Sequence, residues 1–178
     1  MRLILLFALG CASAPKWVEQ NTIGEAGFLF NVGEASGIKN EKLARSTANN
    51  RARAEVSKSW EVFLATVART YTESDPEKGV WGCGIRTVSD EFLNEVEIVE
   101  EWTHPDGRLF SRARLDLRDV AGYLTRYYRL APEAQARMEK AVDAAYAEVA
   151  GVPPGTYARI VAESHPVHLL ASNGEGCR

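Results

Sequence analysis

Residues 40–72, NEKLARSTANNRARAEVSKSWEVFLATVARTYT, decide the fold, because they predict one unusually long helix. The stretch contains neither Gly nor Pro. Small and apolar residues recur at every fourth position, a helical spacing that differs from the two-residue alternation of a strand. These residues are Ala44, Ala48, Ala52, Val56, Trp60, Leu64 and Ala68. A four-residue row drifts around a helix of about 3.6 residues per turn, so its alanine half and its bulky half should meet different surfaces.

The flanks of this helix predict its ends and the strand before it. Asn40 is a good N-cap, and the helix should stop ahead of Pro76, because the residue before a proline resists the helical conformation. Upstream, residues 27–35 are rich in aromatic and branched residues and are bounded by glycines, which predicts a strand. Alternate residues of a strand share a face, so Phe28 and Phe30, followed by Val32, are expected to point together into the core.

Residues 94–103 and 108–117 predict a β-hairpin. The turn between them contains Pro105-Asp106-Gly107, a sequence that favours a tight turn. In the first strand we expect Val96, Ile98 and Trp102 on one face, with Glu95, Glu97 and Glu101 on the other. Arg112, Arg114 and Asp116 alternate along the second strand. Glu97 and Glu101 are therefore expected opposite Arg112 or Arg114.

The rest of the chain predicts further helices. Residues 118–130 are amphipathic, and Pro132 suits the first position of a helix that Gly151 ends. We expect residues 151–178 to form an irregular tail, in which residues 157–162 form either a short helix or a strand. The fold class predicted is α+β, a small antiparallel sheet with one long helix across a face, plus C-terminal helices. The expected core consists of Phe28, Phe30, Val32, Val56, Trp60, Phe63, Val67, Val96, Ile98, Leu109 and Leu115.

The first residues, MRLILLFALGC, have the features of an export signal. Arg2 is the only charged residue, seven apolar residues follow it, and small residues lead to Cys11. Ala8-Leu9-Gly10-Cys11 resembles the lipobox of bacterial lipoprotein precursors, which implies cleavage before Cys11 and a lipid attached to that cysteine. The alternative is a soluble protein whose first residues form a buried strand or a frayed terminus. On the lipoprotein interpretation, residues 1–10 are a signal peptide, 11–16 a lipidated tether and 17–150 a single domain ahead of the tail.

The order of these segments resembles the bacterial lipoprotein-20 family. The resemblance rests on Pro15-Lys16-Trp17-Val18, on the strand that ends at Val32-Gly33-Glu34-Ala35, on the alanine row of the helix and on the hairpin. It covers residues 15–118. It implies an exported, lipid-anchored α+β domain and supplies no catalytic residues. By the sorting rules of such lipoproteins, the membrane would be the outer membrane, with the domain facing the periplasm.

Composition narrows the class of partner. A net charge of −3 and an isoelectric point near 5.7 lack the basic footprint of a nucleic-acid binder. With 46% hydrophobic and 25% charged residues, the chain resembles ordinary globular proteins. We therefore expect two partners, a membrane reached through the lipid and an unidentified envelope protein, and no nucleic acid.

Two further cysteines, Cys83 and Cys177, are disulfide candidates, because an exported protein meets an oxidising environment. A bridge between them would close a loop of about 95 residues and stabilise the fold by up to about 4–5 kcal/mol. Alternatively, Cys177 is a free thiol close to the end of the chain.

Two functional hypotheses follow. The first is a non-catalytic, membrane-tethered binding or assembly module that has no cofactor and no metal. The second is an exported hydrolase or metal-dependent enzyme that uses His104, His165 or His168, with Glu163 nearby. A structural zinc site needs about four ligands and no cysteine pair completes one, so we favour surface histidines and the first hypothesis.

Overall fold

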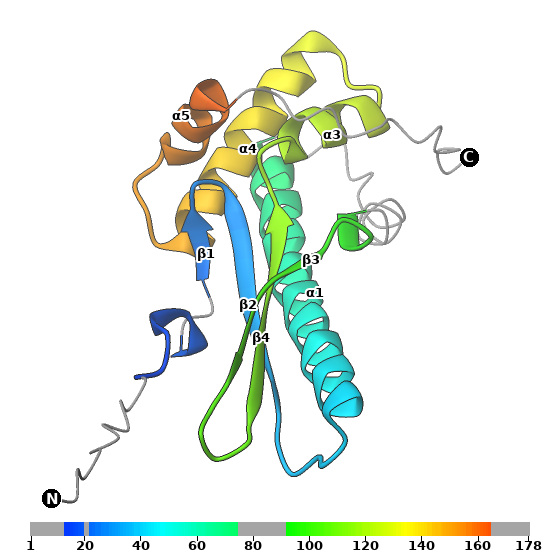
Figure 1. Cartoon of the computed structure of the whole chain (residues 1–178). Helices are drawn as coiled ribbons and strands as arrows, with labels where there is room; N and C mark the ends of the chain where they lie inside the picture. The colour runs from blue at the N-terminus through cyan, green and yellow to red at the C-terminus, as the bar shows by residue number, and fades with distance from the viewer. Residues whose placement is uncertain (1–12, 20–21, 75–91, 165–178) are drawn as a thin grey trace, which may run out of the picture.

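The computed structural model describes residues 13–19, 22–74 and 92–164, and it confirms an α+β fold. One long helix, α1, packs across a face of an antiparallel sheet, and the C-terminal helices gather around the second half of α1 (Figure 1). The elements are the 3-10 helix η1 (Lys16–Glu19), strands β1 (Thr22–Glu25), β2 (Phe28–Ala35), β3 (Glu97–Thr103) and β4 (Leu109–Asp116), and helices α1 (Glu41–Ser74), α3 (Val120–Tyr127), α4 (Pro132–Ala150) and α5 (Thr156–Glu163).

Helix α1 begins and ends close to the predicted residues. The Asn40 side chain caps it, because its Oδ1 accepts a hydrogen bond of 3.0 Å from the Leu43 backbone N–H. The helix has 34 residues, so it is about 50 Å long. That length lets its first half cover the sheet while its second half reaches the C-terminal helices (Figure 1).

The sheet has the strand order β1-β2-β4-β3, and all neighbouring strands are antiparallel. The hairpin of β3 and β4 is confirmed, although β3 begins at Glu97 rather than at residue 94. In its turn, the His104 N–H donates to the Arg108 carbonyl at 2.8 Å, and Gly107 has a φ of 90°. Strand β1 has no counterpart in the sequence-based expectations.

The face of β2 that packs on α1 is opposite to the one predicted. Leu29, Asn31, Gly33 and Ala35 face the helix and are buried. At Gly33 the two backbones lie so close that an added Cβ would be 2.2 Å from the Ala52 nitrogen. The prediction placed Phe28, Phe30 and Val32 on this side, and it is wrong because their bulk cannot fit where the backbones meet.

The two halves of α1 do meet different surfaces, as its drifting row predicts. The alanine half packs near Ala35 and Leu109 of the sheet, with Ala44 and Ala48 buried. The bulky half lies in the main core, where the ring centroids of Trp60 and Phe92 are 4.8 Å apart. The predicted core residues that the structure buries are Phe30, which lies on the other face of the sheet, and Val56, Trp60, Phe63, Val67, Val96, Leu109 and Leu115.

The C-terminal helices complete this core. Pro132 occupies the first turn of α4, and Gly151 ends the helix in the left-handed conformation, with a φ of 65°. Helix α5 confirms the first of the two alternatives for residues 157–162, a short helix, and extends it by one residue at each end. Tyr157 is buried against the rest of the domain and holds α5 in place, so the folded part continues past residue 150.

Candidate interaction surface

The face of the sheet turned away from α1 is the most distinctive surface of the domain, and we call it the open face. Cross-strand register places aromatic residues of β2 beside arginines of β4, which in turn lie beside glutamates of β3. Its residues are Phe28, Phe30, Glu97, Glu100, Trp102, Phe110, Arg112 and Arg114.

Arginine side chains cover the phenylalanines of the open face. The Arg112 guanidinium carbon lies 3.9 Å from the ring centroid of Phe30, and that of Arg114 lies 4.8 Å from Phe28. A cation over a ring face contributes about 0.5–2 kcal/mol, with the larger values where water is excluded. The Arg112 side chain is only 13% exposed, so this layer of guanidinium groups takes the place of a second helical layer.

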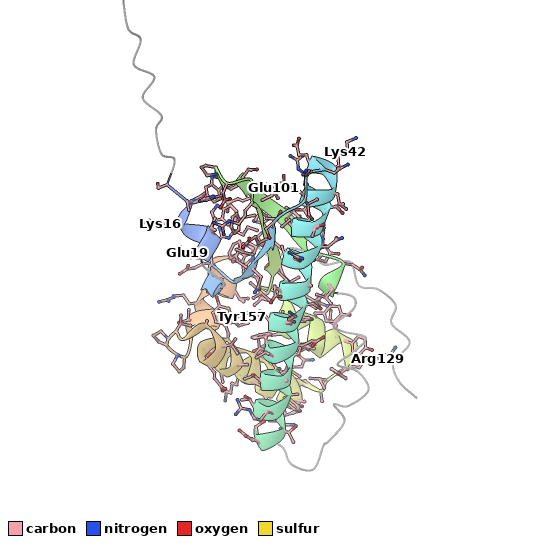
Figure 2. The ribbon with its side chains drawn as sticks, turned by 90° about the horizontal axis from the view of Figure 1, so that it is seen from below. Lys16, Glu19, Lys42, Glu101, Arg129 and Tyr157 are labelled. Carbon is pink, nitrogen blue, oxygen red and sulfur yellow. The ribbon has the colours of Figure 1, made fainter. Side chains whose placement is uncertain are left out.

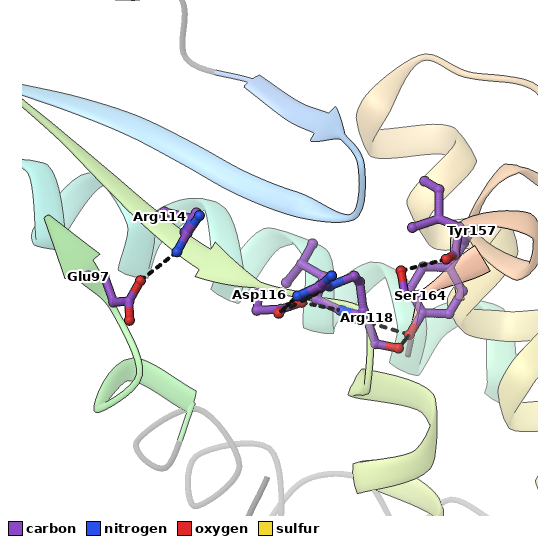
Figure 3. Close-up of polar contacts among 8 residues, drawn as sticks. Glu97, Arg114, Asp116, Arg118, Tyr157 and Ser164 are labelled. Carbon is purple, nitrogen blue, oxygen red and sulfur yellow. Dashed lines mark hydrogen bonds and ion pairs between the residues drawn. The ribbon is translucent and has the colours of Figure 1, made fainter. Parts of the chain in front are cut away.

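Each of these arginines also pairs with a glutamate of β3. Arg112 donates to Glu100 at 2.9 Å. Arg114 donates to Glu97 at 2.7 Å, and Figure 3 shows this second pair. The predicted pairing of Glu97 is thereby confirmed. The open face consequently presents alternating cationic and anionic groups whose charges nearly cancel.

A β-bulge between Ile98 and Glu100 changes the rest of the predicted alternation of β3. The bulge adds one residue, Val99, so that Glu101 turns to the α1 side and pairs with Arg45 at 3.1 Å. Trp102 turns to the open face, where its ring lies 5.6 Å from that of Phe110. Our expectation that Trp102 shares a face with Ile98 is wrong for this reason.

Helix η1 lies against the open face. It contacts β2 and β4, and its Trp17 and Val18 are half-buried. Figure 2 shows Lys16 and Glu19 of η1 on one side of the sheet and Lys42 of α1 on the other. The chain therefore enters the folded domain on the side opposite α1.

The corner of the open face near α5 is held by a polar cluster. The Arg118 guanidinium pairs with Asp116 and lies 4.6 Å from the Phe28 ring. The Tyr157 hydroxyl donates to the Leu117 carbonyl at 2.9 Å and accepts from the Ala121 N–H at 3.4 Å. Burial raises the pKa of Tyr157 well above its ordinary value.

In the turn between β3 and β4, hydrogen bonds lower the pKa of Asp106. The Arg108 backbone N–H donates to Asp106 at 3.0 Å, and this bond, with smaller contributions from the Arg108 and His104 side chains, lowers the pKa of Asp106 to about 2. His104 Nδ1 lies 2.7 Å from Asp106 Oδ1. His104 is thus engaged in the turn itself.

Most residues singled out from the sequence lie outside the described part of the chain. These are Cys11, Cys83, Cys177, His165 and His168. Glu163, which is described, is the last residue of α5 and is exposed. The lipid attachment and the disulfide stay predictions.

No helix among residues 13–19, 22–74 and 92–164 is long and apolar enough to cross a membrane. Within the same residues, no group of three or more His, Cys, Asp or Glu is placed to hold a metal ion.

Sequence reasoning missed the open face because it assigned the aromatic side of β2 to the core. One pattern in the sequence indicated the opposite assignment of the two faces of β2. Gly33 and Ala35, which alternate with the bulky residues, provide the small surface that the alanine row of α1 needs. Matching small residues to small residues would have assigned the two faces correctly.

Comparisons of the chain with protein-family models, with curated proteins and with solved structures found no match.

Proposed function

We propose that this protein is an exported, lipid-anchored lipoprotein of the bacterial envelope, whose domain acts as a non-catalytic binding or assembly module. The observation that carries the proposal is the lipobox-like Ala8-Leu9-Gly10-Cys11, placed only a few residues before a folded domain. The resemblance to the lipoprotein-20 family supports the same class, and the acidic composition argues against a nucleic-acid partner. The outer membrane, with the domain on its periplasmic side, is the location that fits this class.

The described surface supports binding more than catalysis. The charged residues of the open face form structural pairs with one another and stacks on aromatic rings. His104, one of the histidines considered for an enzyme, bonds within its own turn. Arginine and aromatic residues are the types enriched where protein surfaces bind partners.

Replacement of Cys11 tests the anchor. Wild-type protein is expected in the membrane fraction with an intact mass that begins at Cys11 and includes added lipid. Cys11→Ala is expected to lack the lipid mass and to be released or mislocalised, with its thermal unfolding nearly unchanged, because the lipid contributes about 0.8 kcal/mol per buried CH₂ to membrane binding and nothing to folding.

Cys83→Ala is the matched control for this experiment. It keeps the anchor and is expected to stay with membranes, while it loses stability if the Cys83–Cys177 bridge forms. A wild-type mass that retains Met1, or that begins at Cys11 without lipid, overturns the lipoprotein proposal. Crosslinking of the anchored protein in envelope extracts, followed by mass spectrometry, then identifies the partner protein.

A further inference from the structure

The short distance along the chain between Cys11 and the domain restricts how the anchored protein can lie. Only Ala12, Ser13 and Ala14 separate Cys11 from Pro15. Four residue steps span at most about 14 Å, even when the chain is fully extended. The polar headgroup layer on each side of a bilayer is itself roughly 5–8 Å thick. Once Cys11 carries its lipid, Pro15 must therefore lie within several ångströms of the membrane surface.

Pro15 directly precedes η1, so no flexible residues lie between them. Its carbonyl accepts a hydrogen bond of 3.0 Å from the Val18 N–H, which starts the 3-10 helix. Helix η1 packs on β2 and β4, on the side of the sheet opposite α1 (Figure 2). The anchor thus approaches the domain from the side of the open face.

We infer that η1 and the adjoining open face lie against the surface of a phospholipid bilayer, and that α1 lies on the side turned away from it. This inference rests on the proposed lipid anchor at Cys11. It specifies how the domain is oriented on the membrane. In this orientation, the outer surface of α1 is accessible to other proteins.

The chemistry of this side suits a headgroup layer. Exposed Lys16 is a donor for lipid phosphates, and half-buried Trp17 is of the residue type that is enriched at membrane interfaces. The partly exposed pair of Arg114 and Glu97 on the open face presents a cationic and an anionic group to zwitterionic headgroups, which carry both a phosphate and an ammonium group. Because the charges nearly cancel, the surface needs the lipid anchor to stay bound.

Labelling of native lysines tests the orientation. The lipidated protein is reconstituted into phosphatidylethanolamine–phosphatidylglycerol vesicles and treated with a water-soluble acetylating reagent. Mass spectrometry then compares Lys16 with Lys42 and Lys58, which are exposed on α1. The matched variant carries a Gly/Ser linker of about 20 residues between Ser13 and Ala14, whose root-mean-square length is about 25 Å.

We expect labelling of Lys16 to be several-fold slower in the wild type than in the linker variant, while Lys42 and Lys58 react equally in both. Equal labelling of Lys16 in the two proteins, with both bound to vesicles, overturns the orientation and leaves the anchor intact. Slower labelling of Lys42 instead places α1 against the bilayer and also overturns it. Failure of the wild type to float with vesicles contradicts the lipid anchor itself, so the two failures are distinguishable.

Discussion

At Gly33 the backbones of β2 and α1 lie too close together to leave room for a side chain. A Cβ there would lie 2.2 Å from the Ala52 nitrogen and 2.3 Å from the Ala48 oxygen, both of them backbone atoms. Backbone atoms within a helix cannot move aside as the end of a flexible side chain can. The absence of a side chain at this position therefore sets the distance between β2 and α1.

Replacing Gly33 with Ala should destabilise the protein by about 3 kcal/mol or more, because overpacking against rigid atoms forces the layers apart. Gly37→Ala is the matched control. Gly37 has no atoms within 4 Å of the added Cβ but has a φ of 71°, so it should cost only about 1 kcal/mol. Urea unfolding measures both variants. A Gly33→Ala variant no less stable than Gly37→Ala would contradict the close packing.

Among the strands, β3 shows how one extra residue redistributes charged side chains between two faces. Its bulge at Val99 lets Glu100 pair with Arg112 on the open face while Glu101 reaches Arg45 on α1. A regular strand of the same sequence would place Glu100 and Trp102 on one side and Val99 and Glu101 on the other. It would move at least one glutamate away from its arginine.

Two single-residue deletions distinguish the effect of the bulge from that of the Glu100–Arg112 ion pair. Removing Val99 should regularise β3 and keep Glu100 opposite Arg112, whereas removing Glu100 should place Val99 there. Both shorten the strand equally, so the deletion of Glu100 should be less stable by about 0.2–1 kcal/mol, the range for a cross-strand charge pair. Thermal unfolding at low salt measures the difference. Equal stabilities, or the reverse order, would argue against the bulge as described.

The sequence predicts elements better than it predicts faces, and β2 and β3 show why. Helix α1 and the hairpin follow from local spacing, capping and turn residues, all of which act within a few positions along the chain. The face of β2 depends on what packs across from it, so the close approach at Gly33 outweighs the hydrophobicity of Phe28 and Phe30. The bulge at Val99 leaves no local mark that distinguishes it from an ordinary strand residue, and it shifts every later residue of β3.

The open face could not be predicted from residues that are close together in the sequence, for a related physical reason. Arg112 and Phe30 are far apart in the sequence, and they stack only because β2 and β4 pair in one particular register. From sequence alone, an arginine on a strand indicates solvent and a phenylalanine indicates a core. Their combination, a ring covered by a guanidinium group, becomes visible only when the two strands are placed side by side.

At the scale of the whole molecule, buried tyrosines connect the C-terminal helices to the rest of the domain. Tyr157 joins α5 to the segment between β4 and α3 through the Leu117 carbonyl and the Ala121 N–H. Asp143 of α4 accepts hydrogen bonds from the Gly155 and Ala158 backbone N–H groups at 2.6 and 3.2 Å, which fixes the start of α5. The domain should therefore unfold as one cooperative unit that includes α5.

The tyrosines also predict how stability depends on alkaline pH. Burial raises the pKa of Tyr128 to about 12 and raises the pKa values of Tyr146 and Tyr157 above the ordinary value of 10.0. The folded state thus holds these protons more tightly than the unfolded state does. Their contribution to stability is complete below about pH 10 and is lost as the pH rises toward 12.

Alkaline titration followed by phenolate absorbance and circular dichroism should show these tyrosines ionising together with loss of the fold. Tyr157→Phe is the informative variant, because it removes one ionisable group and leaves the buried Leu117 carbonyl and Ala121 N–H without the hydroxyl. It should lose about 1–3 kcal/mol at neutral pH and show a shallower decline of stability above pH 10. Ionisation of every tyrosine near pH 10 with the circular dichroism unchanged would mean that these hydroxyls are accessible to water, and that α5 does not seal this end of the core.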